Sequence, residues 1–421
     1  MKFKIFNTYP ISISLSPNTE EDDIKLALRL IFSPGKWRKG GEISVLEQEF
    51  KNYFEAKEAV SFNSGRSAFL AILKSLDLKE GDEVLLQAFT CNAAVNPILY
   101  FGLRPVFVDC DRSFNLDPKD LANKITERSK VVVVQHTFGQ PARMDEILKI
   151  CDNNKLILIE DCAHSLGAEY KGKKVGTFGK AAFFSFGRDK IISSVYGGMV
   201  VSNDPEIGKR VRDFQKKCSF PLSSWVLQQL LHPVLVNYLV LPAYRFPSFG
   251  KIILNMLQLT RVLSKAVSRE EKRGKITSYF PKKFPNALAI LALNQFRKLE
   301  KFNNHREKIA KIYIEELKNR FEFQEDLKST KRIFMRFPIL IKKGQDTDKI
   351  LREARKKKIL LDDGWRKTPI VPPDTDLEKM RYRVGECKNA EDIAKRIINL
   401  PTHINISEED ARRIAKLLKK M

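Results

Sequence analysis

The sequence is poor in the features that mark secreted, metal-binding and exported proteins. It has only six cysteines in 421 residues, with no Cys-x-x-Cys pair and no regular spacing. We therefore expect reduced thiols rather than a disulfide framework. No histidine–cysteine cluster has the spacing of metal ligands, and we expect no metal site. The opening residues Met1–Phe6 precede no long apolar core, so we expect no signal peptide.

Acidic residues are scarce relative to basic ones. The chain has 75 Lys and Arg against 51 Asp and Glu, a formal net charge of +24. The basic residues are spread along the chain with no single basic arm, so we expect no nucleic-acid partner. A positive field also suits an anionic small substrate or an anionic membrane surface, and a general lysine bias would produce the same excess. The hydrophobic fraction of 43% is typical of a globular protein with two or three domains.

The stretch Leu156–Val201 carries the candidate chemistry. Short apolar runs at 156–159 and 181–186 predict strands buried on both faces. Asp161 follows the first run and Lys190 follows the second. Ligands of open α/β sheets bind beyond the carboxyl ends of the strands, so we expect both side chains at that edge. An amine that forms a Schiff base and an acid that keeps a ring nitrogen protonated suit pyridoxal phosphate (PLP).

Three motifs occur in order in this stretch. They are Asp161-Cys162-Ala163-His164, Ser185-Phe186-Gly187-Arg188-Asp189-Lys190 and Gly197-Gly198. The set resembles the DegT-type family of PLP-dependent nucleotide-sugar aminotransferases. The resemblance implies a fold-type-I α/β architecture, with a mostly parallel seven-stranded sheet between helices in a large domain and a smaller α+β C-terminal domain. A single loop lysine or capping aspartate would carry little weight, and the ordered set carries the interpretation.

A second motif lies at the start of a predicted helix. Asn63-Ser64-Gly65-Arg66-Ser67-Ala68 follows a strand predicted at 59–62, and a strand, a glycine turn and a helix N-terminus together bind anions. The resemblance implies that the Gly65–Ser67 turn and Ser185 bind the cofactor phosphate. Arg66 stands where the family has threonine, and it either adds charge to this phosphate site or points away.

Position 91 departs from the family pattern. Cys91 stands where the family has an aromatic residue that stacks on the cofactor ring. We expect Phe89, His136 or the Cys91 thiol itself to face the ring.

The resemblance also implies roles for the remaining site residues. Lys190 would hold PLP covalently and, once freed, shuttle the proton of the reaction as a general acid–base. Asp161 would keep the ring nitrogen protonated. His164 would bond near the ring oxygen or support Asp161, and the alternative is a core histidine without a catalytic role.

The expected reaction moves an amino group from an amino acid, with glutamate the expected donor, to a keto-sugar nucleotide in surface polysaccharide or glycoconjugate biosynthesis. We expect a cytoplasmic homodimer. One alternative is a PLP-dependent sugar dehydratase, but that branch of the family typically has histidine in place of the lysine, and Lys190 argues against it. The other is a catalytically silent, membrane-associated relative.

The chain is expected to have three parts. Residues 1–214 form the large PLP-binding domain with an N-terminal helical segment, residues 215–284 a helical, apolar and basic insert, and residues 285–421 a long linking helix and the small C-terminal domain. Residues 342–383, which shape the sugar pocket in the family, match its pattern poorly. We expect Ser407 and Asp410 to cap a terminal helix.

The insert is the least familiar part. Its first apolar segments are interrupted by Gln228, Gln229, His232 and Pro233, so we expect no transmembrane span. We predict a second apolar helix over 252–267. The insert either packs as a lid or dimer element or lies peripherally on the inner membrane face. The family's Asn-Tyr-Arg, which often reaches a neighbouring subunit's phosphate, is replaced by Pro281-Lys282-Lys283.

Overall fold

The computed structural model describes residues 10–246 and 249–421, so the expectation about Met1–Phe6 lies outside the described residues. Its centre is a seven-stranded sheet with the strand order β2-β11-β10-β7-β6-β3-β5. All neighbouring strands are parallel except β11, which is antiparallel to both β10 and β2. The strands are β2 (Glu58–Phe62), β3 (Glu83–Gln87), β5 (Arg104–Val108), β6 (Ser129–Gln135), β7 (Ile157–Asp161), β10 (Ala181–Ser185) and β11 (Gly198–Ser202). The predicted α/β fold with a mostly parallel central sheet is confirmed.

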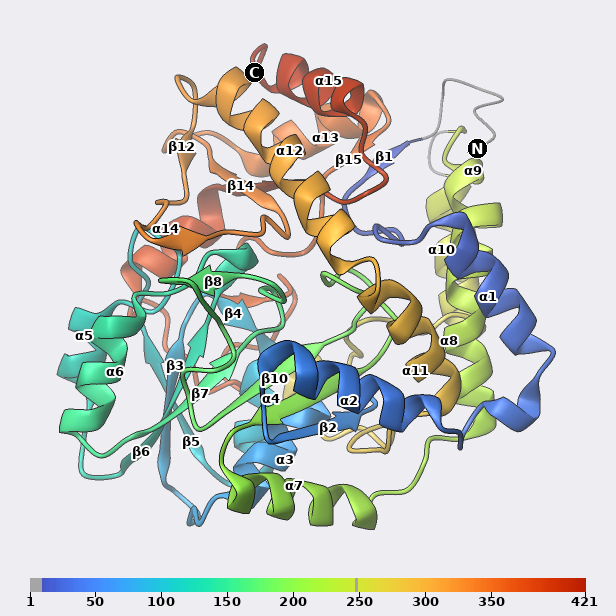
Figure 1. The fold of residues 1–421 in the computed structure, drawn as a ribbon. Coiled ribbons are helices and arrows are strands. Elements are labelled where there is room, and N and C mark those ends of the chain that lie inside the picture. The colour runs from blue at the N-terminus through green and yellow to red at the C-terminus, as the bar shows by residue number, and fades with distance from the viewer. Residues whose placement is uncertain (1–9, 247–248) are drawn as a thin grey trace.

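Helices flank this sheet and explain why its strands are so apolar (Figure 1). In β6, Val131–Val134 are at most 3% exposed, as expected for strands covered on both faces. The flanking helices are α2 (Glu42–Phe54), α3 (Gly65–Ser75), α4 (Asn92–Tyr100), α5 (Pro118–Lys124), α6 (Met144–Asn153) and α7 (Pro205–Lys217).

The carboxyl edge of the sheet brings the two central motifs together. β7 ends at Asp161, and β10 runs parallel beside it with Phe183 opposite Asp161. The loop that leaves β10 carries Lys190 and then returns the chain as β11. The loop therefore starts and ends at one edge, and Lys190 stays next to the end of β7.

The insert is a group of helices on one flank of the molecule, beside α1 (Glu21–Ile31) (Figure 1). It comprises α8 (Ser223–Leu235), the π-helical stretch η3 (Val236–Val240), α9 (Leu241–Ala243), α10 (Phe249–Leu259) and the 3-10 turn η4 (Glu271–Arg273). The predicted helix over 252–267 is wrong beyond Leu259. Arg261 adopts a φ of 60°, a left-handed conformation that a helix cannot continue through.

One segment of the insert has the length and composition of a membrane span. The helix Ser223–Ala243 passes that test, and 39% of its most apolar window is buried in the protein. α8 packs on α1 and on α11 (Asn286–Phe296), and both Gln229 and His232 are buried there. Because α8 has protein partners on one side, length and composition alone do not assign it to a bilayer.

The C-terminal part has a smaller sheet and its own apolar core. Its sheet order is β12-β14-β17, and Ile339, Tyr313 and Ile414 are among the buried residues of this second core. Its elements are α12 (Leu299–Leu317), β12 (Glu322–Phe323), β14 (Phe337–Leu340), α13 (Thr347–Lys356), β15 (Ile359–Leu360), α14 (Lys388–Arg396), β17 (Ile397–Leu400) and α15 (Glu408–Leu418). The predicted capping box of Ser407 and Asp410 is present at the start of α15.

The N-terminal strand crosses to this C-terminal part. β1 (Ile11–Ser12) pairs in parallel with β15, and Ile11 belongs to the second core. His403 bonds through Nε2 to the carbonyl of Ser12 at 2.8 Å. The remaining short elements are η1 (Pro34–Lys36), β4 (Thr90–Cys91), η2 (Thr137–Gly139), β8 (Glu169–Tyr170), β9 (Lys173–Lys174), β13 (Thr330–Lys331) and β16 (Ile370–Val371).

Candidate active site

A cavity of about 370 Å³ opens at the carboxyl edge of the sheet. Most of the predicted site residues line it, and they come from four separate stretches of the sequence. These residues are Gly65, Arg66, Cys91, Asp161, His164, Ser185 and Lys190. Ser67 is the predicted residue that does not line it. The sheet edge thus brings together an amine, an acid, an imidazole and a helix N-terminus.

Asp161 is buried at the floor of the cavity. It is 5% exposed, and one carboxylate oxygen accepts a hydrogen bond from the Ala163 N–H at 3.0 Å. Burial raises the pKa of Asp161 to about 6, although this bond and the nearby Lys190 favour the charged form. A buried carboxyl with an elevated pKa is well suited to pair with a cationic ring nitrogen, because the cation restores the charged form.

His164 is buried beside an aromatic cluster. Its ring stacks on Phe138 at 5.6 Å between centroids and meets the Trp365 ring at 4.8 Å. Burial, with a contribution from Lys190, lowers the pKa of His164 well below its usual range, so the ring is neutral. Nδ1 accepts a long bond of 3.5 Å from the Phe138 N–H, which leaves Nε2 to carry the proton. His164 is therefore a neutral donor at the cavity wall.

The first turn of α3 has the geometry of the expected anion site. A helix start leaves N–H groups without partners inside the helix, and the N–H of Ser67 is taken by the Ser64 side chain at 3.2 Å. Gly65 and Arg66 line the cavity next to Ser185. A Cβ on Gly198 would lie 2.5 Å from the Gly65 nitrogen, so the absence of a side chain at Gly198 lets β11 lie against this turn.

Ser67 faces away from this site. Its hydroxyl donates to the Asn63 side chain at 2.8 Å and lies 2.8 Å from the Ser64 hydroxyl. These bonds hold the turn in shape, while Ser64 lies at the cavity wall. The structure therefore gives Ser64, which the sequence motif contains but did not single out, the position that we expected for Ser67.

Arg66 forms a buried ion pair with the insert. Its guanidinium contacts the Glu271 carboxylate, and Glu271 also accepts a bond from the Tyr279 hydroxyl. The Glu271 side chain is fully buried, and Arg66 donates a further bond to the Ala266 carbonyl at 2.9 Å. Arg66 thus joins the anion-binding turn of the large sheet to the insert, a contact that neither of its predicted roles included.

This pair yields a stability prediction. Glu271→Gln is expected to destabilise the protein by about 3–5 kcal/mol, because it leaves the Arg66 charge buried without its partner. Urea unfolding of the cofactor-free protein would measure the loss. Glu270→Gln, one residue earlier and exposed, is the matched control. If PLP or inorganic phosphate stabilises the variant more than it stabilises the wild type, Arg66 also reaches the phosphate, and if it stabilises both equally, Arg66 serves the insert alone. Equal stability of the two variants would contradict the ion-pair role.

Two further contacts tie the insert to the cavity. The Tyr196 hydroxyl donates to the Lys265 carbonyl at 2.6 Å, and Arg188 donates to the Ser264 hydroxyl. Both residues belong to the loop that carries Lys190. Lys265, Ala266, Val267 and Lys272 consequently line the cavity, and we call residues 264–274 the roof. For residues 264–274, this geometry supports the lid alternative.

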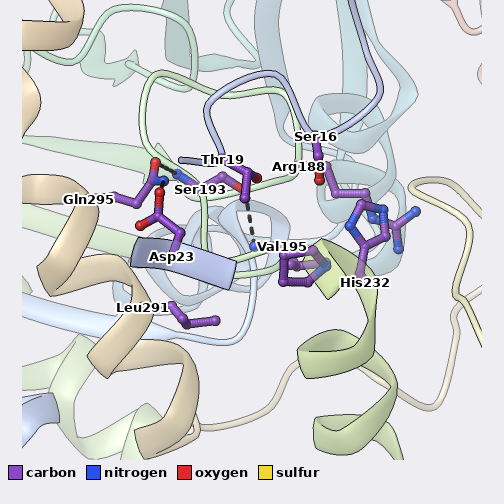
Figure 2. Close-up of a pocket in the computed structure, with 10 residues that line it drawn as sticks. Ser16, Thr19, Asp23, Arg188, Ser193, Val195, His232, Leu291 and Gln295 are labelled. Atoms are coloured by element: carbon purple, nitrogen blue, oxygen red, sulfur yellow. Dashed lines mark hydrogen bonds between the residues drawn. The ribbon is translucent and has the colours of Figure 1, made fainter. Parts of the chain in front are cut away.

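A second, water-sized cavity of about 20 Å³ lies behind the Lys190 loop (Figure 2). Figure 2 shows Gln295 reaching both Asp23 and the backbone of Ser193, with bonds of 2.8 and 3.1 Å. Arg188 and His232 lie on its other side. Burial, followed by the charge of Arg188, lowers the pKa of His232 well below its usual range. This cavity is too small for a substrate and belongs to the support of the loop.

The C-terminal part closes the opposite wall. Arg336 is 2% exposed and contacts Asp189 of the Lys190 loop, and it also pairs with Asp363 at 2.8 Å. Burial opposes ionisation of Asp189, but Lys190 and Arg336 hold its pKa below its usual value. Asp363 and Trp365 line the cavity. Both lie in the stretch that matches the family pattern poorly, and sequence analysis missed them.

The three residues expected to face the cofactor ring differ in whether they line the cavity. Cys91 lines the cavity, and burial raises the pKa of its thiol. Phe89 and His136 do not line it: Phe89 packs on Trp365, and His136 bonds to Glu160 and to the Ala142 N–H. Of the three candidates only Cys91 is placed at the cavity wall, together with Val371 and Pro372.

One group among the described residues has donor atoms close enough to hold a metal. The atoms of His136, Glu160 and Cys162 lie within 4.8 Å of one another. Glu160 already accepts bonds from the N–H groups of Gly176, Phe178 and Gly179 at 2.7–2.8 Å. A carboxylate with its oxygens so engaged acts as a structural anchor, and the arrangement gives no reason to place a metal there.

The residues present fit PLP. The α3 N-terminus with Ser185 offers donors for a phosphate, Asp161 offers an acid for a ring nitrogen, and Lys190 offers an amine in the same cavity. The close approach at Gly198 places the first turn of α3 against the start of β11, where the Lys190 loop ends.

Comparisons with known proteins agree with this chemistry. A model of the DegT/DnrJ/EryC1/StrS aminotransferase family matches residues 18–224 and 255–419. An uncharacterized protein of Methanocaldococcus jannaschii is 30% identical over 390 residues, covering 89% of this chain and 88% of the relative. GDP-perosamine synthase of Escherichia coli O157:H7 is 26% identical over 373 residues, covering 88% of this chain and 87% of the relative.

The fold is also similar to that of solved aminotransferase structures. A solved structure of PseC from Helicobacter pylori, an aminotransferase involved in the biosynthesis of pseudoaminic acid, superposes with a TM-score of 0.75 and 23% sequence identity. The match covers 98% of each chain. At this identity the likeness concerns the fold, and the family model and the aligned relatives carry the chemistry.

Proposed function

The chain belongs to the DegT/DnrJ/EryC1/StrS aminotransferase family, and from this membership we propose that it moves an amino group from an amino acid to the keto carbon of a nucleotide-linked sugar. Enzymes of this family depend on PLP. The observation that carries the proposal is the placement of Lys190 and Asp161 in one cavity, after neighbouring parallel strands. The dehydratase alternative is not favoured, because Lys190 is retained and GDP-perosamine synthase is among the relatives reported above.

The proposed roles follow from the chain's own groups. Bound PLP supplies the electron-accepting ring for the transfer. Gly65, Arg66 and Ser185 bind its phosphate at the α3 N-terminus. Asp161 holds the proton on the ring nitrogen, and neutral His164 donates a hydrogen bond at the cavity wall. Lys190 anchors the cofactor and moves the proton between the reacting carbons.

The positive charge of the roof favours an acceptor substrate that carries phosphate groups. Lys265 and Lys272 bring positive charge to the cavity from above, where Asp374 pairs with Lys272 at 2.6 Å. Lysine is a common ligand of phosphate groups, and a nucleotide-linked sugar carries such groups away from its reacting carbon. The roof would then hold the nucleotide end while the keto carbon reaches Lys190. Glutamate is the proposed donor.

The direct test is an assay of the holoenzyme with glutamate and a panel of keto-sugar nucleotides. We expect amino-sugar formation with at least one GDP- or dTDP-linked 3- or 4-keto sugar, and none with the corresponding sugar lacking its nucleotide. Mass spectrometry of the sugar product reads out the exchange of carbonyl oxygen for an amino group. Turnover of a keto acid but of no sugar nucleotide across the panel would overturn the proposed substrate class while leaving the transaminase chemistry intact.

The proposal also covers the oligomeric state of the enzyme and its location in the cell. The enzyme acts as a homodimer in the cytoplasm, with sites near the subunit interface, as the family resemblance implies. Lys282 and Lys283 are the proposed interface residues, although in one chain Lys282 already donates to Ser219 at 2.8 Å. Sedimentation equilibrium checks the mass, and a monomer would rule this out. The three-part division at residues 214 and 284 remains our proposal for the domain organisation.

A further inference from the structure

The outer face of α10 is an apolar stripe in solvent. Phe249, Ile252, Met256 and Leu259 recur at helical spacing and are 50%, 51%, 59% and 84% exposed. We call these four residues the α10 stripe. α10 lies at the outer flank of the molecule, away from the central sheet (Figure 1). The stripe therefore has no cover from the rest of the described chain.

The stripe is not a by-product of a loosely packed helix. On its opposite side α10 packs against η3 and α9, and Ile253, Leu254 and Leu257 are half-buried there. The helix is thus apolar on both its inner and its outer face. Surface helices of soluble proteins normally place polar residues outward, and a contiguous exposed apolar face marks a binding surface.

The chain segment that carries the stripe has charges of one sign. Residues 214–269 contain no aspartate or glutamate, and Lys251 and Arg261 lie within and just beyond α10. On helix α1, which packs on α8 of the insert, the acidic Glu21 is paired with Lys25, and Asp22 and Asp23 are paired with Lys298. An apolar helix face in a segment whose charged residues are all basic is complementary to a layer of acyl chains beneath anionic headgroups.

A second copy of this chain fits the same face poorly. A two-fold contact sets one patch against itself, so Lys251 and Arg261 would face other basic residues with no acid to pair. We therefore propose that the α10 stripe docks the enzyme on an anionic lipid bilayer, with α10 lying in the plane of the interface and Lys251 and Arg261 at the headgroups. α8 keeps its protein partners and does not span.

A short chain segment connects α10 to the wall of the active-site cavity. The chain leaves α10 at Leu259 and reaches the roof at Ser264, and Leu263 between them is buried. A lipid-bound α10 thus holds one end of the segment whose Lys265 and Lys272 line the cavity. The docked enzyme would have its roof fixed close to the membrane surface.

The test is co-sedimentation of the PLP-loaded enzyme with vesicles. We expect it to pellet with mixed phosphatidylglycerol and phosphatidylcholine vesicles at low salt, to be released as salt rises, and to stay soluble with phosphatidylcholine alone. The triple variant Ile252→Gln/Met256→Gln/Leu259→Gln should lower the bound fraction roughly tenfold, and Lys251→Glu/Arg261→Glu similarly. Retained cofactor and an unchanged melting temperature verify that the variants fold, since all these side chains are exposed.

Matched variants separate the stripe from the general positive charge. Val384→Gln removes an exposed apolar residue outside the insert, and Lys416→Glu/Lys420→Glu makes the same charge change on and after α15. Both are expected to bind like the wild type. The proposal is overturned if the wild type stays in the supernatant with anionic vesicles at low salt. It is also overturned if the control variants lose binding equally, or if the wild type pellets without vesicles by self-association through α10.

Discussion

Lys190→Ala is expected to abolish turnover of any keto-sugar nucleotide, and this is the largest effect that we predict. The substitution removes both the covalent anchor of the cofactor and the group that moves the proton. Acid–base catalysis alone contributes roughly 10²–10⁴-fold, so the combined loss should exceed that range. The rest of the cavity is unchanged, and the variant should still bind PLP without a covalent bond. Steady-state assays and the cofactor absorbance of the purified variant measure the two properties separately.

Chemical labelling tests the same assignment independently of activity. Borohydride reduction of the wild-type holoenzyme followed by peptide mapping should place the pyridoxyl group on Lys190. Lys180→Ala, at an exposed lysine just before β10, is the matched control and should retain full activity and labelling. Label on another lysine, or none despite added PLP, would refute the role of Lys190, as would near-normal turnover of Lys190→Ala.

Asp161→Asn is expected to lower turnover by roughly 10²–10³-fold, the range typical for removal of one preorganised electrostatic contact. Asparagine keeps the shape but carries no charge to hold a proton on the ring nitrogen. The exposed Asp152→Asn, at the end of α6, is the control and should be fully active. Turnover within a few-fold of wild type would show that the ring nitrogen does not depend on this carboxylate.

Although Asp161→Asn should lower turnover, we expect it to raise the stability of the cofactor-free protein at neutral pH relative to the wild type. Because burial raises the pKa of Asp161 from 3.8 to about 6, the folded state holds its proton more tightly than the unfolded state. Ionisation of Asp161 therefore costs the folded state stability as the pH rises from about 4 to 6, a loss on the order of 2–3 kcal/mol. Asp161→Asn lacks this loss. Urea unfolding of both cofactor-free proteins at pH 4 and pH 7 should show the variant gaining relative to wild type, and parallel pH profiles would contradict it.

Sequence analysis found the parts of the site that are local in the chain. Asp161 and Lys190 each follow a short apolar run, and the edge of a parallel sheet brings such positions together whatever lies between them. The α3 turn was also recognisable from local sequence, because a glycine turn before a helix binds anions through its backbone. These inferences needed no knowledge of the tertiary contacts.

The parts that were missed depend on distant contacts. Arg66 meets Glu271 and Tyr279 across some two hundred positions of sequence, and no spacing rule links an α3 turn to a 3-10 turn in the insert. Trp365 reaches His164 from a stretch without a recognisable pattern. The Ser64 and Ser67 hydroxyls could not be told apart from sequence, since their roles depend on how the turn orients them. The helix over 252–267 was predicted too long because apolar periodicity continued past the left-handed Arg261.

The pairing of β1 with β15 has a consequence for the order in which the enzyme is made. Ser12 and His403 are bonded across 391 positions, so at ~5–20 residues per second the ribosome needs roughly 20–80 seconds after the first strand to supply its partner. During that interval Asn18, whose side chain donates to the Lys190 carbonyl and accepts from Arg306 at 2.7 Å, is attached to an unpaired N-terminus. The nascent large sheet can form earlier, and we expect its lysine loop to gain full support only after β15 and His403 have been made. We therefore expect cofactor capture to follow this pairing, and ribosome-bound chains truncated before β15 should acquire PLP poorly.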